Sequence, residues 1–259
     1  MQLDLTDKTV LISGAHRGTG QIIAARFAEE GAQVLLHGFT EDQAAAACRE
    51  IDAEPVHGDI LTDAGADSLV QQCLSDGRVV DVLVNNYGTA DAGTWATSDA
   101  TAWIDAYQKN VLSAQRLIQR LTPSMRERRW GRIINLGTVG STRPNARMPH
   151  YYAAKGALAT MTVSLAQELG GTGITVNLVS PGLIRTPEVE AAYLERGRRK
   201  GWGQTWDEIE PRVAADIPIG RIVRREEVAD LVLFLASPLS DAIHGQNIRI
   251  DGGALGVVN

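Results

Sequence analysis

Two side chains in the stretch "HYYAAKGA", which runs from His150 to Ala157, could carry out acid–base chemistry. Tyr151 and Lys155 are four residues apart, so in a helix they lie on one face. A tyrosine with a pKa near 10 exchanges protons poorly at neutral pH, but a nearby ammonium group favours the phenolate and lowers that pKa. The pair therefore suits proton exchange with an alcohol or a carbonyl. Spacing alone leaves two alternatives open: Tyr152 could act instead, or both side chains could serve packing only.

A glycine-rich turn, "SGAHRGTG", contains Gly14, Gly18 and Gly20 and follows the apolar run Thr9–Ser13. Glycine lets the backbone turn tightly and approach a phosphate closely, and the N-terminus of the following helix offers N–H donors. The spacing differs from the common G-x-G-x-x-G fingerprint. A glycine turn between a strand and a helix is also frequent in proteins without such a ligand. Its place after the first predicted strand nevertheless predicts dinucleotide binding.

The end of the second predicted strand bears on which dinucleotide binds. Proteins that bind NAD place a carboxylate there for the ribose 2′-hydroxyl, whereas this strand ends in "LLHGF", with Gly38 and Phe39 at that point. A 2′-phosphate would meet no repulsion, Arg17 could pair with it, and Thr40 could donate a hydrogen bond to it. These features favour NADP(H) over NAD(H). The strand has no basic residue of its own, however, and a solvated loop cation is the alternative for Arg17.

A regular alternation of short apolar runs and longer helical patterns must position these residues. Continuous apolar runs between helices are typical of parallel strands covered on both faces. The predicted fold is therefore α/β, a doubly wound parallel sheet of the Rossmann-like kind, formed by residues 1–259 as a single domain. Ligands of such sheets bind at the carboxyl ends of the strands. The runs are TVLIS, AQVLLHG, AEPVHGD, VVDVLVNN, GRIINLG, GITVNLVSPG and NIRIDGG.

Polar residues follow several of these runs, at the edge where a ligand is expected. Asp59 follows the third run and could accept a hydrogen bond from an adenine amino group or cap the next helix. Asn85–Asn86 end the fourth run and could line the cleft or tie neighbouring loops together. Thr138 and Ser141 follow the fifth run. The turn "SPGLIRT" after the sixth run could hold a nicotinamide amide through its backbone and Thr186.

Composition limits the classes of protein to which the chain could belong. Its 259 residues, 44% hydrophobic and 22% charged, can bury a core without disulfides or metal. A formal net charge of −6 argues against nucleic-acid binding, so the basic cluster "RGRRKG" is expected to be a solvated helix end. Cys48 and Cys73 fit no metal-ligand spacing and suit a reducing compartment. Neither a signal peptide nor an apolar run of about 20 residues is visible, so a cytoplasmic protein without a membrane partner is expected.

A glycine-punctuated segment from Arg185 to about Gly220 lies between the sixth apolar run and the last helix. It looks loop-like, and it holds two tryptophans, Trp202 and Trp206, that are expected to be exposed. Such a segment is typical of a mobile lid over a pocket; a packed surface excursion is the alternative. Together with Tyr193 and the basic cluster, these residues would admit a bulky or acidic substrate.

Taken in order, these motifs resemble those of the short-chain dehydrogenase/reductase superfamily, most of all its branch of 3-oxoacyl-[acyl-carrier-protein] reductases. "SGAHRGTG" is similar to the family's TGxxxGxG turn, "NNYG" to NNAG, "YYAAK" to YxxxK and "SPGLIRT" to PGxxxT. The ordered set, which ends in "IRIDGG", spans almost the whole chain. The resemblance implies an NAD(P)-dependent oxidoreductase that interconverts a ketone and a secondary alcohol by hydride transfer. It disfavours the enoyl-reducing relatives, which separate their tyrosine and lysine by more residues.

The resemblance also implies roles for four residues. Tyr151, rather than its neighbour, matches the catalytic tyrosine because the family places it four residues before the lysine. Lys155 would bind the nicotinamide ribose and lower the tyrosine pKa, and Asn110 would anchor a water in the proton relay. Thr138 stands where the family has a serine: it keeps the hydroxyl but adds a methyl group that stiffens the side chain. Ser141 is the competing candidate, although the alignment needs no gap at Thr138.

Two smaller departures, Ser13 for a threonine and Tyr87 for an alanine, leave the reaction type intact, and Tyr87 would line or crowd the cofactor cleft. The resemblance implies a small carbonyl or alcohol substrate. Family tetramers, and the small-residue-rich helix "YYAAKGALATMTVSLAQEL", predict a homo-oligomer, most simply a tetramer. The alternative function is a dinucleotide-binding sensor or regulatory protein of the same fold. The predicted cofactor-binding residues are Gly14, His16, Arg17, Gly18, Thr19, Gly20, Gly38, Phe39, Asp59, Ile60, Asn86, Gly88, Tyr151, Lys155, Pro181, Gly182, Ile184 and Thr186.

Overall fold

A computed structural model describes residues 2–257 of the chain. Within this range, seven strands form one parallel sheet in the order β3-β2-β1-β4-β5-β6-β9. The order reverses between β1 and β4, which is the point where ligands of such sheets bind. The predicted doubly wound sheet is confirmed. The strands are β1 (Thr9–Ile12), β2 (Gln33–Gly38), β3 (Glu54–His57), β4 (Val82–Asn85), β5 (Gly131–Leu136), β6 (Ile174–Pro181) and β9 (Asn247–Ile250).

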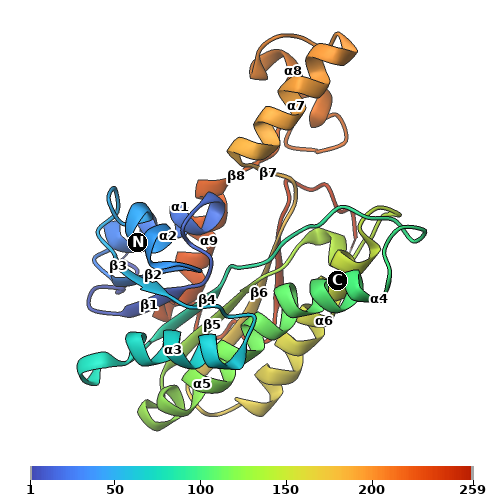
Figure 1. The fold of residues 1–259 in the computed structure, drawn as a ribbon. Coiled ribbons are helices and arrows are strands. Elements are labelled where there is room, and N and C mark those ends of the chain that lie inside the picture. The colour runs from blue at the N-terminus through green and yellow to red at the C-terminus, as the bar shows by residue number, and fades with distance from the viewer. Residues whose placement is uncertain (1, 258–259) are drawn as a thin grey trace.

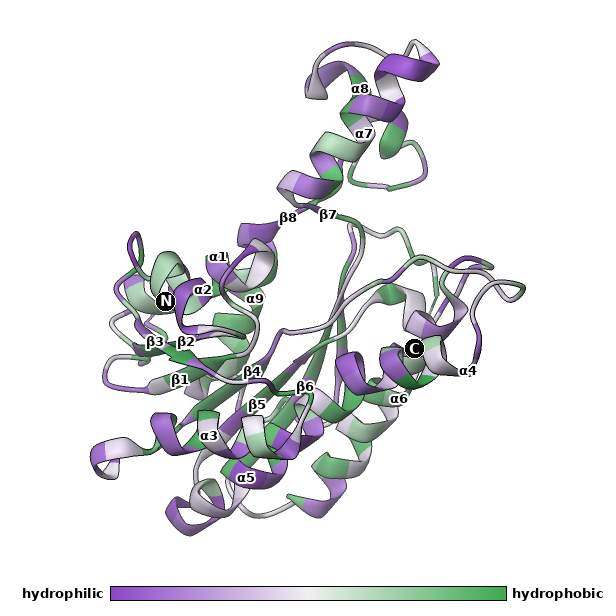
Figure 2. Cartoon of the chain, viewed as in Figure 1, coloured by the Kyte–Doolittle hydropathy of each residue, from purple (hydrophilic) through white to green (hydrophobic). Residues whose placement is uncertain are grey.

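Helices cover both faces of this sheet (Figure 1). α1 packs against α9 on one face, and α3, α5 and α6 lie on the other. The central strands β1, β4, β5 and β6 are largely apolar because both their faces are buried, and Figure 2 shows hydrophobic colouring along them. The helices of the body are α1 (Gly18–Glu29), α2 (Glu41–Ala47), α3 (Asp63–Cys73), α4 (Ala100–Tyr107), α5 (Ser113–Arg128), α6 (Pro149–Glu168) and α9 (Arg225–Ala236).

The predicted lid segment folds into two helices, α7 (Pro187–Lys200) and α8 (Trp206–Val213), instead of a loop. The short parallel strands β7 (Ile184–Arg185) and β8 (Val223–Arg224) join these helices to the body. In Figure 1 the α7–α8 unit projects away from the sheet at the end where the strands finish. The basic cluster forms the exposed last turn of α7, as predicted.

The two tryptophans of this segment are less exposed than the sequence suggests. Trp206 is buried and Trp202 is half-buried, so the expectation of two exposed side chains was wrong. Trp206 packs in a small core with Ala214 and Ile222, and the guanidinium carbon of Arg185 lies 4.8 Å from the centre of its ring. Short helices are stable in water mainly when they bury such a face. The α7–α8 unit is therefore a packed unit with its own apolar cluster.

Two remaining expectations concern cysteines and membranes. Cys73 is buried on α3 and Cys48 is half-buried, and both are free thiols. Over residues 2–257, no helix combines the length and the apolar character that crossing a membrane would need.

Candidate active site

The loop between β1 and α1 adopts a conformation that favours glycine. Gly14 and Gly18 have φ angles of 61° and 66°, and a Cβ on Gly14 would lie 3.0 Å from the Cβ of Tyr87. α1 begins at Gly18 with no side-chain cap and no acidic residue in its first turn. Its first N–H groups are therefore open to an anion. This loop fits the phosphates of a dinucleotide.

A buried histidine on β2, His37, holds this loop in place, and sequence reasoning missed it. Its Nδ1 accepts a hydrogen bond from the Gly14 N–H at 2.9 Å, and its Nε2 lies 2.9 Å from the carbonyl oxygen of Gly58. Because Nδ1 accepts, the ring is neutral and Nε2 carries the proton that is donated to Gly58. Burial lowers the pKa of His37 to about 4. The only available signal was a histidine inside an apolar strand.

Asn86, at the end of β4, ties that strand to the glycine loop. Its Nδ2 donates to the carbonyl oxygens of Ser13 and Gly14 at 3.0 and 3.2 Å. A Cβ on Gly20 would overlap the same amide group, which explains the third glycine of the motif. The Ser13 hydroxyl accepts from the Tyr87 N–H at 3.1 Å. Serine, which stands here in place of the family's threonine, therefore keeps the hydroxyl oxygen that this contact needs.

The predicted adenosine end contains residues that line the cleft and residues that support it. Arg17 is exposed and lines the cleft. Gly38 supports it, because a Cβ there would lie 2.7 Å from a backbone nitrogen of α2. The ring of Phe39 packs edge-on against that of Tyr87, with 4.7 Å between centroids. The side chain of Ile60 is fully buried in the core and lies away from the cleft.

Asp59 lies on the exposed loop after β3, at the same end of the sheet. Its Oδ1 accepts from the Leu61 N–H at 3.0 Å. α3 is capped by Thr62, whose side chain accepts from the Gly65 N–H. The alternative of Asp59 as the helix cap was therefore wrong, and its Oδ2 stays open to a ligand.

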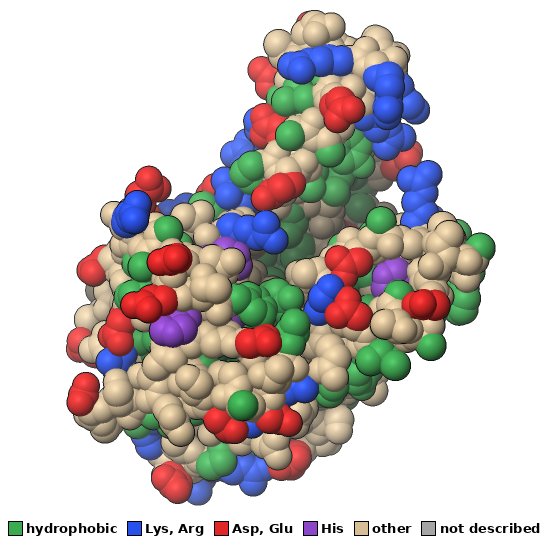
Figure 3. All heavy atoms as spheres, viewed as in Figure 1, with side chains coloured by type: hydrophobic (Ala, Val, Ile, Leu, Met, Phe, Trp, Pro, Cys, Tyr) green, Lys and Arg blue, Asp and Glu red, His purple; other side chains and the backbone are tan. Residues whose placement is uncertain are grey.

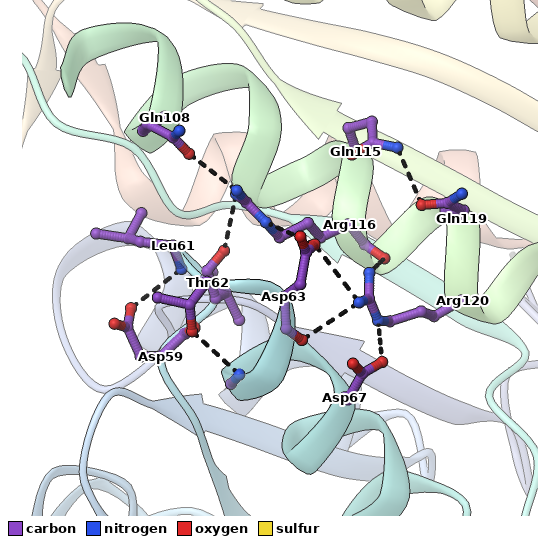
Figure 4. Close-up of polar contacts among 12 residues, drawn as sticks. Asp59, Leu61, Thr62, Asp63, Asp67, Gln108, Gln115, Arg116, Gln119 and Arg120 are labelled. Atoms are coloured by element: carbon purple, nitrogen blue, oxygen red, sulfur yellow. Dashed lines mark hydrogen bonds and ion pairs between the residues drawn. The ribbon is translucent and has the colours of Figure 1, made fainter. Parts of the chain in front are cut away.

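Figure 4 shows how this loop is connected to the helix that carries Asn110. Arg116 on α5 donates to Asp63 at 3.1 Å, to Gln108 at 3.0 Å and, at 3.5 Å, to the carbonyl oxygen of Ile60. Gln108 opens the π-helical turn Gln108–Leu112 between α4 and α5. The side chain of Arg116 is 11% exposed, whereas that of Asp63 is 77% exposed. The hydrogen bonds of Arg116 link the two ends of the candidate site.

Asn110 lies in this π-helical turn and points toward the sheet edge. Its Nδ2 donates to the carbonyl oxygens of Thr89 and Ala106 at 3.1 and 3.0 Å. Its Oδ1 is buried and has no hydrogen-bond partner among residues 2–257. A Cβ on Gly88 would lie 2.6 Å from this Oδ1 and 2.8 Å from Nζ of Lys155. Because Gly88 has no Cβ, Oδ1 of Asn110 and Nζ of Lys155 can both lie close to it. Oδ1 is a buried acceptor that lacks a donor at this place.

Tyr151 and Lys155 lie on α6; Lys155 is buried, whereas Tyr151 is half-buried and lines the cleft. Nζ of Lys155 donates to the carbonyl oxygen of Leu136 at 2.8 Å, and burial lowers the lysine pKa to about 8. Burial, with a smaller contribution from Tyr152, raises the pKa of Tyr151 to about 12, although the nearby Thr138 hydroxyl opposes the rise. The predicted lowering of the tyrosine pKa by Lys155 was therefore wrong for this structure, because desolvation dominates.

Thr138 is the hydroxyl residue that contacts the tyrosine. It precedes a short 3-10 turn, Val139–Ser141, and its Oγ1 accepts from the Gly140 N–H at 3.2 Å. The same side chain lies near the Tyr151 hydroxyl and lowers its pKa. The competing Ser141 hydroxyl donates instead to the Thr138 carbonyl oxygen at 2.7 Å. The geometry therefore favours Thr138 as the partner of a substrate oxygen.

One cleft of about 580 Å³ runs along the carboxyl ends of the strands from the glycine loop to Tyr151. Figure 3 shows the surface hollowed between the body and the projecting α7–α8 unit. Pro181, Ile184 and Thr186 line its far end, while Gly182 faces a neighbouring pocket with Thr138. Sequence reasoning expected most of the lining, Tyr87 included. The lining residues that it missed are Thr89, Ala90, Asp91, Leu136, Gly137 and Glu188.

Comparisons with known proteins agree with this geometry. Residues 14–254 match a family model described as Enoyl-(Acyl carrier protein) reductase. The chain is 32% identical to the 3-oxoacyl-[acyl-carrier-protein] reductase FabG of Escherichia coli (strain K12) over 97% of this chain and 98% of the relative. The crystal structure of L-sorbose reductase from Gluconobacter frateurii, complexed with NADPH and L-sorbose, superposes with a TM-score of 0.92 at 31% identity, over 100% of both chains. Gluconate 5-dehydrogenase from Burkholderia cenocepacia J2315, in complex with NADP and tartrate, gives a TM-score of 0.87 at 25% identity, over 99% of this chain and 98% of the other.

The chain belongs to the short-chain dehydrogenase/reductase family. It is an NAD(P)-dependent oxidoreductase that interconverts a ketone and a secondary alcohol. The names of these relatives point to different substrates: 3-oxoacyl-[acyl-carrier-protein], L-sorbose and gluconate. Family membership therefore identifies the reaction, and the residues around Thr138 and Tyr151 must account for the substrate.

Proposed function

We propose that Tyr151 is the general acid and base of this reaction and that Thr138 binds the substrate oxygen. The observation that carries the proposal is that the Thr138 hydroxyl lies near enough to that of Tyr151 to lower its pKa, at the junction of the cleft and the neighbouring pocket. A carbonyl oxygen placed between them would accept from both. Proton donation and oxyanion stabilisation would then act on one atom.

A bound nicotinamide dinucleotide supplies or accepts the hydride at the carbon of the carbonyl group. During reduction Tyr151 donates its proton to the substrate oxygen, and its pKa of about 12 keeps that proton in place at neutral pH. Lys155, whose pKa is about 8, is mainly an ammonium at pH 7 and would donate to the hydroxyl groups of the nicotinamide ribose. The open Oδ1 of Asn110 and the neighbouring Nζ of Lys155 suit a water that returns a proton to this pair.

We propose NADP(H) as the preferred dinucleotide. Support comes from Arg17, an exposed guanidinium on the cleft, and from the lack of a carboxylate at Gly38 and Phe39. Thr40 uses its oxygen as an acceptor from the Gln43 N–H, which leaves its hydroxyl proton free to donate. The remaining contacts would come from the uncapped start of α1 and from the predicted residues on the cleft wall.

Steady-state assays of a ketone panel with NADPH and NADH in parallel test these assignments. We expect turnover of at least one ketone, loss of turnover in Tyr151→Phe, and preference for NADPH. A tenfold preference for NADH, equivalent to about 1.4 kcal/mol, would overturn the cofactor proposal. A panel that includes unsaturated thioesters tests the enoyl reductase named by the family model; reduction of the double bond alone would overturn the roles of Tyr151 and Thr138.

A sensor or regulatory protein remains the second candidate because threonine stands at the serine position. It would bind NADPH tightly and turn over no ketone on a broad panel. The buried, unpartnered Oδ1 of Asn110 beside the buried Nζ of Lys155 favours the enzyme, since a binding protein has no need of an unsatisfied acceptor there.

We also propose that the protein is a homotetramer in the cytoplasm. A groove between α5 and α6 is lined by apolar side chains such as Ile118, Met161 and Leu165, and Val163 on α6 is 47% exposed. Packing against a second copy would cover both. The free thiols Cys48 and Cys73 suit a reducing compartment. Light scattering that gives a monomer at micromolar concentration would contradict the tetramer.

A further inference from the structure

A second pocket, which we call the Thr138 pocket, lies behind the residue that holds the substrate oxygen. Its volume is about 290 Å³, near the lower end of the range for ligand sites. Its walls come from the turn after β5, the loop before α6, the start of α6, the turn after β6 and the chain after β9. The lining residues are Thr138, Val139, Gly140, Arg143, Asn145, Tyr152, Gly182, Leu183, Ala254 and Leu255.

The walls of this pocket are held by close packing. A Cβ on Gly140 would overlap the ring of Tyr152, so the ring lies directly against the backbone there. The Tyr152 hydroxyl accepts from Nδ2 of Asn145 at 2.9 Å. On the opposite side, a Cβ on Gly182 would lie 3.0 Å from Cα of Asp251. The pocket therefore has a defined shape, and none of its lining residues lies on α7 or α8.

Among residues 2–257, Arg143 is the one charged residue that lines the Thr138 pocket, and no carboxylate of this range lines it. Within residues 2–257, its side chain has no hydrogen bond or ion pair. Other arginines near the site behave differently: Arg185 pairs with Glu190, and Arg221 pairs with Glu227, each through two nitrogen–oxygen contacts. A free guanidinium has donors in a fork that matches a carboxylate.

We propose that the Thr138 pocket binds the body of a small keto acid or of the corresponding hydroxy acid, and that Arg143 binds its carboxylate. The inference rests on the proposed function, since it places the reacting carbonyl at Thr138 and Tyr151. The amide of Asn145 and the Tyr152 hydroxyl supply further polar contacts, which suit hydroxyl groups along the substrate. The small volume disfavours a long acyl chain.

A comparison in which only the charge of the substrate changes distinguishes this proposal from a general preference for polar ketones. The probes are keto acids of increasing chain length, each compared with its own primary amide, which has nearly the same size and no charge. We expect the acid to have the higher kcat/KM at the chain length that spans Thr138 and Arg143. We also expect this advantage to shrink with added salt, because Arg143 is exposed and salt screens such pairs.

Variants of two arginines on the same loop assign the effect to one side chain. In Arg143→Gln the ratio of kcat/KM for the acid to that for its amide should fall at least tenfold, which corresponds to about 1.4 kcal/mol. Arg143→Lys should recover part of the ratio, since charge returns without the guanidinium fork. Arg147→Gln should keep the wild-type ratio, because Arg147 is exposed on the same loop but lies outside the pocket. A merely structural role for Arg143 would lower both rates and leave their ratio unchanged.

Two outcomes would overturn the proposal, and each is distinct from a failure of the proposed function. Equal rates for every acid and its amide, or an equal loss of the ratio in Arg147→Gln, would show that Arg143 does not recognise a carboxylate. In both cases ketones are still reduced, so the roles of Tyr151 and Thr138 stand. Absence of turnover for acids, amides and neutral ketones alike would instead remove the proposed function and this inference with it.

Discussion

The two halves of the candidate site are built by different means. At the dinucleotide end, a buried histidine, an asparagine and glycines without room for a Cβ hold the loops after β1, β2 and β4. At the substrate end, the α7–α8 unit joins the body through two strands of two residues each, and its flanking ion pairs are about a third exposed. Exposed ion pairs contribute little stability. The loops of the dinucleotide end therefore form a rigid frame, whereas the projecting α7–α8 unit is more loosely attached to the body.

The largest effect should come from the residue where the two halves meet. Tyr151→Phe removes the proton donor, so kcat/KM for ketone reduction should fall about 10³-fold, while the dissociation constant for NADPH, measured by fluorescence titration, changes little. Tyr152→Phe is the matched control and should lose far less activity. Similar losses in the two variants would mean that Tyr151 is not the proton donor.

Two substitutions of Thr138 test whether its hydroxyl group or its methyl group matters for turnover. Thr138→Val keeps the shape and removes the hydroxyl, so kcat should fall about 10²-fold, as measured by steady-state kinetics. Thr138→Ser restores the residue that is usual in the family and should retain turnover. Full activity in the valine variant would assign the substrate oxygen to another group.

The pH dependence of stability tests how firmly His37 holds the dinucleotide end. The pKa of His37 in the folded protein is about 4, below the usual 6.5, so the unfolded chain binds this proton more tightly. The contribution of His37 to the free energy of unfolding is complete above pH 6.5. It is lost as pH falls toward 4, by about 3 kcal/mol in all. Denaturant unfolding across this window measures the loss. His37→Gln can form both hydrogen bonds without titrating, so its stability should depend less on pH; an unchanged pH slope would contradict the assignment.

Arg17 tests the cofactor preference at the edge of the rigid half. Arg17→Gln should lower the ratio of kcat/KM with NADPH to that with NADH about tenfold, or about 1.4 kcal/mol, because a charge-assisted bond to the 2′-phosphate is lost. Arg49→Gln removes an exposed arginine beyond the far end of α2 and should leave the ratio unchanged. If neither variant changed the ratio of kcat/KM with NADPH to that with NADH, the cofactor preference would depend on residues other than Arg17.

The smallest effect should come from the loosely attached half. Glu190→Gln breaks the pair with Arg185, whose side chain is 38% exposed, so the free energy of unfolding should change by less than about 1 kcal/mol. Thermal unfolding measures the change. A loss as large as the pH effect at His37 would mean that the α7–α8 unit is held as firmly as the dinucleotide loops.

The same contrast explains what the sequence could predict. The seven apolar runs and the glycine loop were predicted because strand burial and left-handed turns leave local patterns. The clamp by His37 was missed because it joins residues on different strands. The packing of Trp206 was missed because Ala214 and Ile222 come together with it only after the segment folds. The pKa of Tyr151 was predicted in the wrong direction, since its burial is a tertiary property.

Transfer of deuterium from NADPH labelled on the reactive nicotinamide carbon tests the central claim most directly. With a substrate that contains both a ketone and a conjugated double bond, mass spectrometry of the product locates the label. The account predicts deuterium on the carbinol carbon, with no transfer in Tyr151→Phe. Deuterium on the carbon β to an intact carbonyl, or no transfer to any substrate despite tight NADPH binding, would contradict it.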